Sequence, residues 1–185
     1  GILAYQTGWS SSGVGLSWSD RSGKHAGTIN QSSVYDAFRI SPDGKRIALS
    51  QLDSKSRNAD IWLYEISRAM WTRFTFDPAS ERWPIWSPDG GTVAFASNRK
   101  ERYDLYQRTA SGAGIEELLF ESGFNKYSSD WSRDGKYLVY NANDPKTKSD
   151  IWILPMKGGR KPFLFLQTAF NELGATFSPD GRWIA

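Results

Sequence analysis

The stretch Ser41-Pro42-Asp43-Gly44 returns three more times along the chain, once with arginine in place of proline. The later copies begin at Ser87, Ser132 and Ser178, so the serines lie 46, 45 and 46 residues apart. A fixed period of this length is typical of β-propeller blades, each a four-stranded sheet that cannot bury its faces alone. The repeat therefore predicts an all-β fold, a β-propeller with about four four-stranded blades in this chain.

The repeat at 80–122 shows how one blade is built. Apolar and polar residues alternate over 83–87, 92–97, 104–108 and 116–120, and alternation bounded by turn residues is typical of strands. The Ser-Pro-Asp-Gly stretch suits a tight turn between the first two strands, because glycine takes a left-handed backbone without strain. We therefore expect strands A to D in each blade, and no window has the period of a helix.

The repeat also predicts the blade boundaries within a single array over 1–185. Strands B to D of a first blade cover 1–32, complete blades cover 34–78, 80–122 and 125–168, and 170–185 supplies a strand A and the start of a strand B. The outer strands of the first two blades are expected at 26–29 and 72–76.

The two ends of the array predict how the ring closes. The first blade lacks strand A and the C-terminal segment supplies one, and unpaired sheet edges invite pairing. One chain can close as a four-bladed ring, two chains can exchange these strands, or the assembly can stay partly open. We favour the exchange, and hence a homodimer, because four wide aromatic blades would crowd the axis. Since the chain starts at Gly1 and stops inside an apolar strand pattern, we expect it to be a piece of a longer protein.

Composition narrows the function classes. Aromatic residues make up 15% of the chain, which suits packed layers between sheets. The net charge of +3 comes from 23 basic and 20 acidic residues spread along the chain, and without a basic stripe we expect no nucleic-acid partner. The absence of cysteine excludes disulfides and thiolate metal sites. No run approaches the ~18 apolar residues of a membrane span, so no membrane insertion is expected.

Residues that recur in every blade are expected to be structural, because a catalytic group would break the repeat. This applies to the turn carboxylates Asp43, Asp89, Asp134 and Asp180 and to the strand C carboxylates Asp60, Asp104 and Asp150. It also applies to the large apolar residues before each serine, which we expect in the core between blades: Ile40, Trp86, Trp131 and Phe177.

His25 is the only histidine. No nucleophile elbow, phosphate-binding loop, dinucleotide fingerprint or kinase motif occurs, so no catalytic residue is predicted.

The residues that vary between blades lie in the segment just before each strand A. In a propeller this segment faces the mouth of the central channel. We predict that a ligand binds there to Asp36, Glu81, Arg82, Lys126, Asn171 and Glu172. The oxygen-bearing members also match the donors of Ca²⁺, which takes about six to eight oxygen ligands. We favour a solvated rim without a cofactor. The alternative is a divalent metal held by Asp36, Glu81, Asn171 and Glu172.

These motifs resemble a known family. The Ser-Pro-Asp-Gly turn, followed by an apolar strand, then Ser97-Asn98-Arg99 and Asp104-Leu105-Tyr106, is similar to the repeats of TolB-like β-propellers. The stretches 20–24 and 75–78 resemble propeller modules attached to bacterial membrane-tethered serine/threonine kinases. The likeness covers nearly the whole chain and departs from the family at Arg133, where proline is usual. The family usually has more blades than this chain holds, which also favours the exchange between two chains.

The resemblance implies a module that binds protein or peptide ligands, in a periplasmic or extracytoplasmic domain of a bacterial protein, and it transfers no catalytic residue. A second hypothesis is a weak, metal-assisted hydrolase of esters or phosphate esters at the channel mouth, similar to the calcium-dependent lactonases and phosphotriesterases. A third is the accessory propeller of a serine peptidase, which requires a hydrolase domain that these residues lack.

Overall fold

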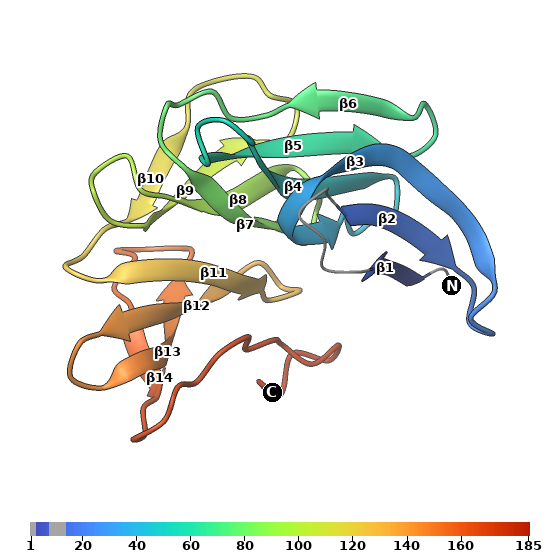
Figure 1. Ribbon diagram of the computed structural model, residues 1–185. Coiled ribbons are helices and arrows are strands. Elements are labelled where there is room, and N and C mark those ends of the chain that lie inside the picture. The colour runs from blue at the N-terminus through green and yellow to red at the C-terminus, as the bar shows by residue number, and fades with distance from the viewer. Residues whose placement is uncertain (1–2, 8–13) are drawn as a thin grey trace.

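The computed structural model describes residues 3–7 and 14–185, which form strands, turns and loops (Figure 1). A six-stranded antiparallel sheet comprises β1 (Leu3–Thr7), β2 (Val14–Ser19), β3 (His25–Ile40), β4 (Arg46–Leu52), β5 (Ala59–Glu65) and β6 (Met70–Arg73). A four-stranded sheet comprises β7 (Glu81–Trp86), β8 (Thr92–Ser97), β9 (Asp104–Thr109) and β10 (Glu117–Phe120). Another comprises β11 (Asn125–Trp131), β12 (Tyr137–Asp144), β13 (Lys148–Pro155) and β14 (Phe163–Leu166).

The predicted all-β fold of four-stranded sheets is confirmed. Each sheet is antiparallel, and the sheets succeed one another along the chain as the blades of a propeller do (Figure 1). The described residues contain no helix, and therefore none long and apolar enough to cross a membrane.

The six-stranded sheet contains two blades that share β3. The first part of β3 pairs with β2 and the second part with β4, so one strand is both the outer strand of one blade and the inner strand of the next. The outer strand predicted at 26–29 lies within this longer strand. Neither glycine nor proline, the strongest interruptions of regular structure, occurs over 28–40. The outer strand predicted at 72–76 instead begins and ends earlier, as β6.

The four repeat turns share one hydrogen-bond pattern. In each turn the serine Oγ donates to the aspartate Oδ1 over 2.5–2.7 Å. The same Oγ accepts the backbone N–H five residues on, over 2.9–3.0 Å. The arginine at 133 leaves this pattern intact, because the Gly135 N–H still donates to the Ser132 carbonyl over 2.9 Å. The recurrent turn carboxylates are therefore structural, as predicted.

We expect Asp134→Ala to destabilise the fold at pH 7 but not at low pH. Hydrogen bonds from the Ser132 hydroxyl and the Lys136 N–H lower the pKa of Asp134 from 3.8 to about 2. A carboxylate with a lowered pKa stabilises the fold above its unfolded pKa, and this contribution disappears as the pH falls towards the folded value. Thermal unfolding at pH 7 and at pH 2 measures the difference between native chain and variant. An equal difference at both pH values would contradict the prediction.

Apolar cores join successive blades, and each core takes side chains from two of them. Ile61 and Phe74 of the second blade pack with Trp86 and Phe95 of the third, and the rings of Phe74 and Phe95 meet edge to face with their centroids 6.5 Å apart. A second core joins the third blade to the fourth, and a third joins the first to the second. The stacking of blades therefore provides the buried faces that a single sheet lacks.

The large apolar residues before the repeat serines meet different surroundings. Trp86 is 6% exposed within the core, as predicted. Trp131 and Phe177 are partly buried and pack against the cores of the fourth blade, whereas Ile40 is 37% exposed, contrary to the expectation.

The two ends of the described chain stay separate. β1 pairs with β2, and after β14 the chain forms a small hairpin through the bridge between Phe177 and Ile184. Within residues 3–7 and 14–185, no strand pairing connects β1 to this hairpin. Closure of the ring, and with it the homodimer by strand exchange, stays a prediction.

Candidate functional site

Four of the predicted ligand residues lie at or near irregular points of the inner strands: Asp36, Glu81, Arg82 and Lys126. The pairing of β3, β7 and β11 with their neighbours shifts register between Tyr35 and Ala37, between Arg82 and Ile85, and between Ser128 and Asp130. Such bulges re-aim side chains and are common beside functional sites. The three inner strands therefore share a backbone irregularity in or near the segment where the sequences of the blades differ.

Asp36 and Arg82 are brought together, although they belong to different blades. Arg82 Nη1 lies 2.6 Å from Asp36 Oδ2, and the two side chains are 24% and 28% exposed. The Ser50 hydroxyl donates to the other carboxylate oxygen of Asp36, and Arg82 Nε donates to Ser80 Oγ over 3.1 Å. A fixed ion pair that solvent can reach thus bridges the second and third blades.

Glu81, in contrast, is completely buried. Its Oε1 accepts from Ser97 Oγ over 2.8 Å and lies 3.5 Å from Arg99 Nη2. Burial raises the pKa of Glu81 to about 7, with the Ser97 hydrogen bond and Arg99 opposing the shift. Its Oε2 has no hydrogen-bond partner among the described residues.

Lys126 is also completely buried. Its Nζ lies 2.7 Å from Asp104 Oδ1 and donates to the carbonyls of Phe124 and Ser122 over 2.6 and 3.4 Å. Burial lowers the pKa of Lys126, although Asp104 favours its charged form. Asp104 thereby has a structural partner, as predicted for the strand C carboxylates, and Lys126 does not present its charge to solvent.

Asn171 and Glu172 lie in the segment after β14 and are bonded to the fourth blade. Asn171 Oδ1 accepts the Ser149 N–H over 3.3 Å, the Glu172 N–H donates to the Ser149 carbonyl over 2.9 Å, and the Thr168 hydroxyl donates to Glu172 Oε1. In the part of the chain that the structure describes, no three His, Cys, Asp or Glu side chains are grouped so as to hold a metal ion. The predicted calcium ligands, Asp36, Glu81, Asn171 and Glu172, form no such group there, and a metal stays a prediction.

An aromatic cluster that was not predicted from the sequence lies beside the Asp36–Arg82 pair. The ring of Trp83 meets those of Tyr103 and Tyr127 edge-on, with centroids 5.3 and 4.6 Å apart. All three side chains are partly exposed. The Arg82 guanidinium lies 6.0 Å from the centre of the Trp83 ring. We call Asp36, Arg82, Trp83, Tyr103 and Tyr127 the strand-start surface.

The backbone of Trp83 is unusual for so large a residue. Its φ is 52°, in the left-handed region that bulky side chains rarely adopt. Such a conformation costs of order 1–3 kcal/mol and persists only where the surrounding structure holds it. Here the Ser128 hydroxyl of the next blade donates to the Trp83 carbonyl. The one signal in the sequence is the Trp83-Pro84 pair inside a strand pattern, because proline within a strand marks a bulge or an edge.

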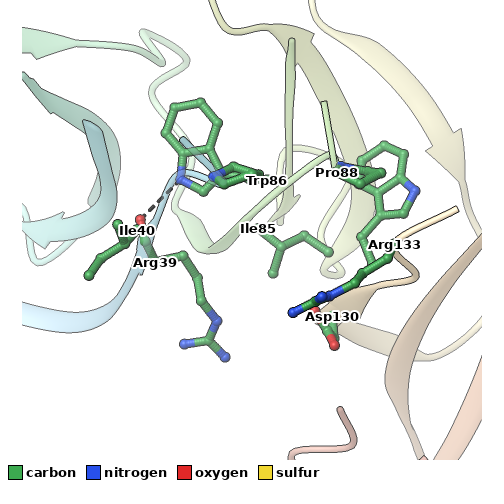
Figure 2. Close-up of a pocket in the computed structure, with 9 residues that line it drawn as sticks. Arg39, Ile40, Ile85, Trp86, Pro88, Asp130 and Arg133 are labelled. Carbon is green, nitrogen blue, oxygen red and sulfur yellow. Dashed lines mark hydrogen bonds between the residues drawn. The ribbon is translucent and has the colours of Figure 1, made fainter. Parts of the chain in front are cut away.

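The other ends of the inner strands border a cavity of about 510 Å³ (Figure 2). Its walls come from the last residues of three inner strands and from the turns that follow: Arg39, Ile40, Pro42, Ile85, Trp86, Pro88, Asp130, Trp131 and Arg133. We call it the strand-end pocket. From the sequence, Ile40, Trp86 and Trp131 were expected in the core and Pro42, Pro88 and Arg133 in turns, and no site was predicted there.

The fold and the cores between blades define a segment of a β-propeller. Residues 19–185 match the sequence model of the TolB β-propeller domain, and the chain belongs to this family. It is 32% identical over 186 aligned residues to a protein of Bacillus subtilis named uncharacterized peptidase YuxL. The match covers 79% of this chain and 28% of that protein, so the chain spans less than a third of this relative.

Solved structures agree on the fold. TolB from Acinetobacter baumannii superposes with a TM-score of 0.82 at 20% identity, over 100% of this chain and 46% of that one. A protein from Agrobacterium tumefaciens described as TolB gives the same TM-score and identity, over 97% of this chain and 67% of that one. At this identity the likeness establishes the propeller fold, and the resemblance drawn from the sequence is confirmed.

Proposed function

We propose that this chain is a protein-interaction module that binds a protein or peptide through the strand-start surface. The observation that carries the proposal is the cluster of Trp83, Tyr103 and Tyr127 around an Arg82–Asp36 ion pair. Tryptophan, tyrosine and arginine dominate the few positions that supply most of the binding energy in protein interfaces. Here they are preorganised by contacts across two blade boundaries, so little freedom is lost when a ligand binds.

The strained backbone supports the same interpretation. Among the described residues, the bulges of β3 and β11 hold no non-glycine residue with positive φ, whereas that of β7 holds Trp83. Packing alone does not require this, because the other two inner strands stack their blades without it. Strained residues gather at ligand contacts and active sites, which favours a role in binding for Trp83.

Membership in the TolB propeller family supports a protein partner in general, and the name of the Bacillus subtilis relative suggests peptides as the ligands to test first. Hydrolysis of esters or phosphate esters stays a prediction, without a contact of the described residues that favours it.

The test is selection of a random peptide library on the immobilised chain, followed by affinity measurements on the enriched peptides. We expect Trp83→Ala to weaken binding at least about tenfold, because truncation of an interface hot spot costs ~2 kcal/mol or more. Trp183→Ala is the matched control, since Trp183 is 72% exposed in the C-terminal hairpin. Circular dichroism checks that both variants fold. A library without enriched binders, or binders that tolerate Trp83→Ala, would overturn the proposal.

A further inference from the structure

Arg133 is the one position at which the chain breaks its own turn repeat. The other three turns carry Pro42, Pro88 and Pro179 there. The Ser132 and Asp134 hydrogen bonds of this turn match those of the others, so the turn itself does not require arginine. The Arg133 side chain is exposed, lines the strand-end pocket, and makes no hydrogen bond or ion pair with any described residue. The positive charge of Arg133 therefore has no structural role among the described residues and is free to contact a ligand.

Arg39 places a second cation in the same pocket. It lies at the end of β3, where the equivalent positions of the next two inner strands are Ile85 and Asp130. Its Nη1 donates to the carbonyl of the preceding residue over 3.0 Å, and it has no carboxylate partner among the described residues. The Trp86 indole N–H donates to the Arg39 carbonyl over 3.0 Å, which fixes the backbone that carries this side chain.

The lining residues leave the pocket with a net positive charge. Among the described residues, Asp130 is the only carboxylate that lines the pocket, so it balances one of the two arginines, and its Oδ2 accepts the Phe177 N–H over 2.8 Å. Ile85 lies between Arg39 on one side and Arg133 on the other (Figure 2). Ile85 and Trp86 are 3% and 6% exposed, so the floor is apolar and packed. The pocket thus combines two available guanidinium groups with an apolar base.

We propose that the strand-end pocket binds the carboxylate of a peptide, with Arg39 and Arg133 as its charged contacts and Ile85 under the adjoining apolar side chain. Guanidinium groups bind carboxylates through two parallel, charge-assisted hydrogen bonds, which makes them suited to this anion. The site is separate from the strand-start surface, because the two lie at opposite ends of the inner strands. The test of the strand-end pocket is therefore independent of the test of the proposed function.

The test follows the indole N–H signals of Trp86 and Trp131 by NMR during titration with N-acetyl-Leu-Leu, which has a free carboxylate. The same peptide as its C-terminal amide, sodium phosphate and sodium chloride are titrated in parallel. We expect a saturable shift with the free carboxylate and none with the amide. Arg133→Pro restores the residue of the other turns and should weaken binding at least about tenfold, since hydrogen bonds to charged groups are the strong ones. Arg39→Gln should act in the same direction.

Lys136→Gln is the matched control, because Lys136 is a cation of the same turn that pairs with Asp134 and does not line the pocket. It should bind like the native chain, as should Trp83→Ala. Equal saturation by phosphate would overturn the assignment to a peptide carboxylate. Equal shifts with sodium chloride, or unchanged binding in Arg133→Pro, would overturn the site itself.

Discussion

Replacing Lys126 by methionine should lower the free energy of unfolding by about 3–5 kcal/mol, the cost of removing one partner from a buried ion pair. Lys126 is completely buried and the side chain of Asp104 is 5% exposed. The variant leaves the Asp104 carboxylate without its cation and the carbonyls of Phe124 and Ser122 without a donor. Urea denaturation followed by circular dichroism measures the change.

Two further variants identify the cause. Lys100 lies 2.7 Å from Glu121, but both side chains are more than half exposed, so Lys100→Met should leave stability nearly unchanged. Adding Asp104→Leu to Lys126→Met removes the stranded charge and should recover much of the loss, because apolar replacement of a whole buried pair is often neutral. A loss below about 1 kcal/mol in Lys126→Met, or no recovery in the double variant, would contradict the buried pair.

The propeller fold could be predicted because the turn sequences that specify its blades are short and recur at a fixed period. Each repeat turn is stabilised by hydrogen bonds between residues at most five positions apart. All the residues that form the turn therefore stand together in a short stretch of sequence. The continuous β3 could not be predicted in this way. The repeat places a blade boundary near residue 33, and Asn30, Ser32 and Ser33 are residue types common in turns, whereas the structure has one strand from His25 to Ile40.

The candidate site could be predicted only in its position along the chain. The segments before the inner strands hold Asp36 and Arg82 as a solvent-accessible pair, but they also hold Glu81 and Lys126, which are buried. Charged residues are rarely buried unless paired, and the partners here are distant: Asp104 precedes Lys126 by 22 residues. Likewise, the conformation of Trp83 depends on Ser128 of the next blade. Contacts between blades decide the surroundings of Lys126 and Trp83, and contacts with the neighbouring strand and the loop after it decide those of Glu81. No local pattern encodes either.

Glu81→Gln should remove a large pH dependence of stability between pH 5 and pH 8. The folded pKa of Glu81 is raised by burial from 4.5 to about 7, so within this window the folded chain keeps a proton that the unfolded chain has lost. Stability linked to this group is therefore present at low pH and falls as the pH rises, by up to about 3 kcal/mol across the window. Urea denaturation at pH 5, 6, 7 and 8 measures this slope in the native chain and in the variant.

The side-chain amide of glutamine is neutral and has one oxygen and one donor group, as a protonated carboxyl group has. Glu81 Oε2 has no hydrogen-bond partner among the described residues, so an ionised oxygen there would be buried without a donor. The variant should therefore equal the native chain at pH 5 and exceed its stability at pH 8, where the native carboxylate is ionised in a buried position. Glu121→Gln is the control, because the Glu121 side chain is 55% exposed and its exchange should leave the slope intact. If the native chain and Glu81→Gln lose stability in parallel up to pH 8, then Arg99, 3.5 Å from Glu81, compensates the buried charge and the carboxylate is ionised throughout.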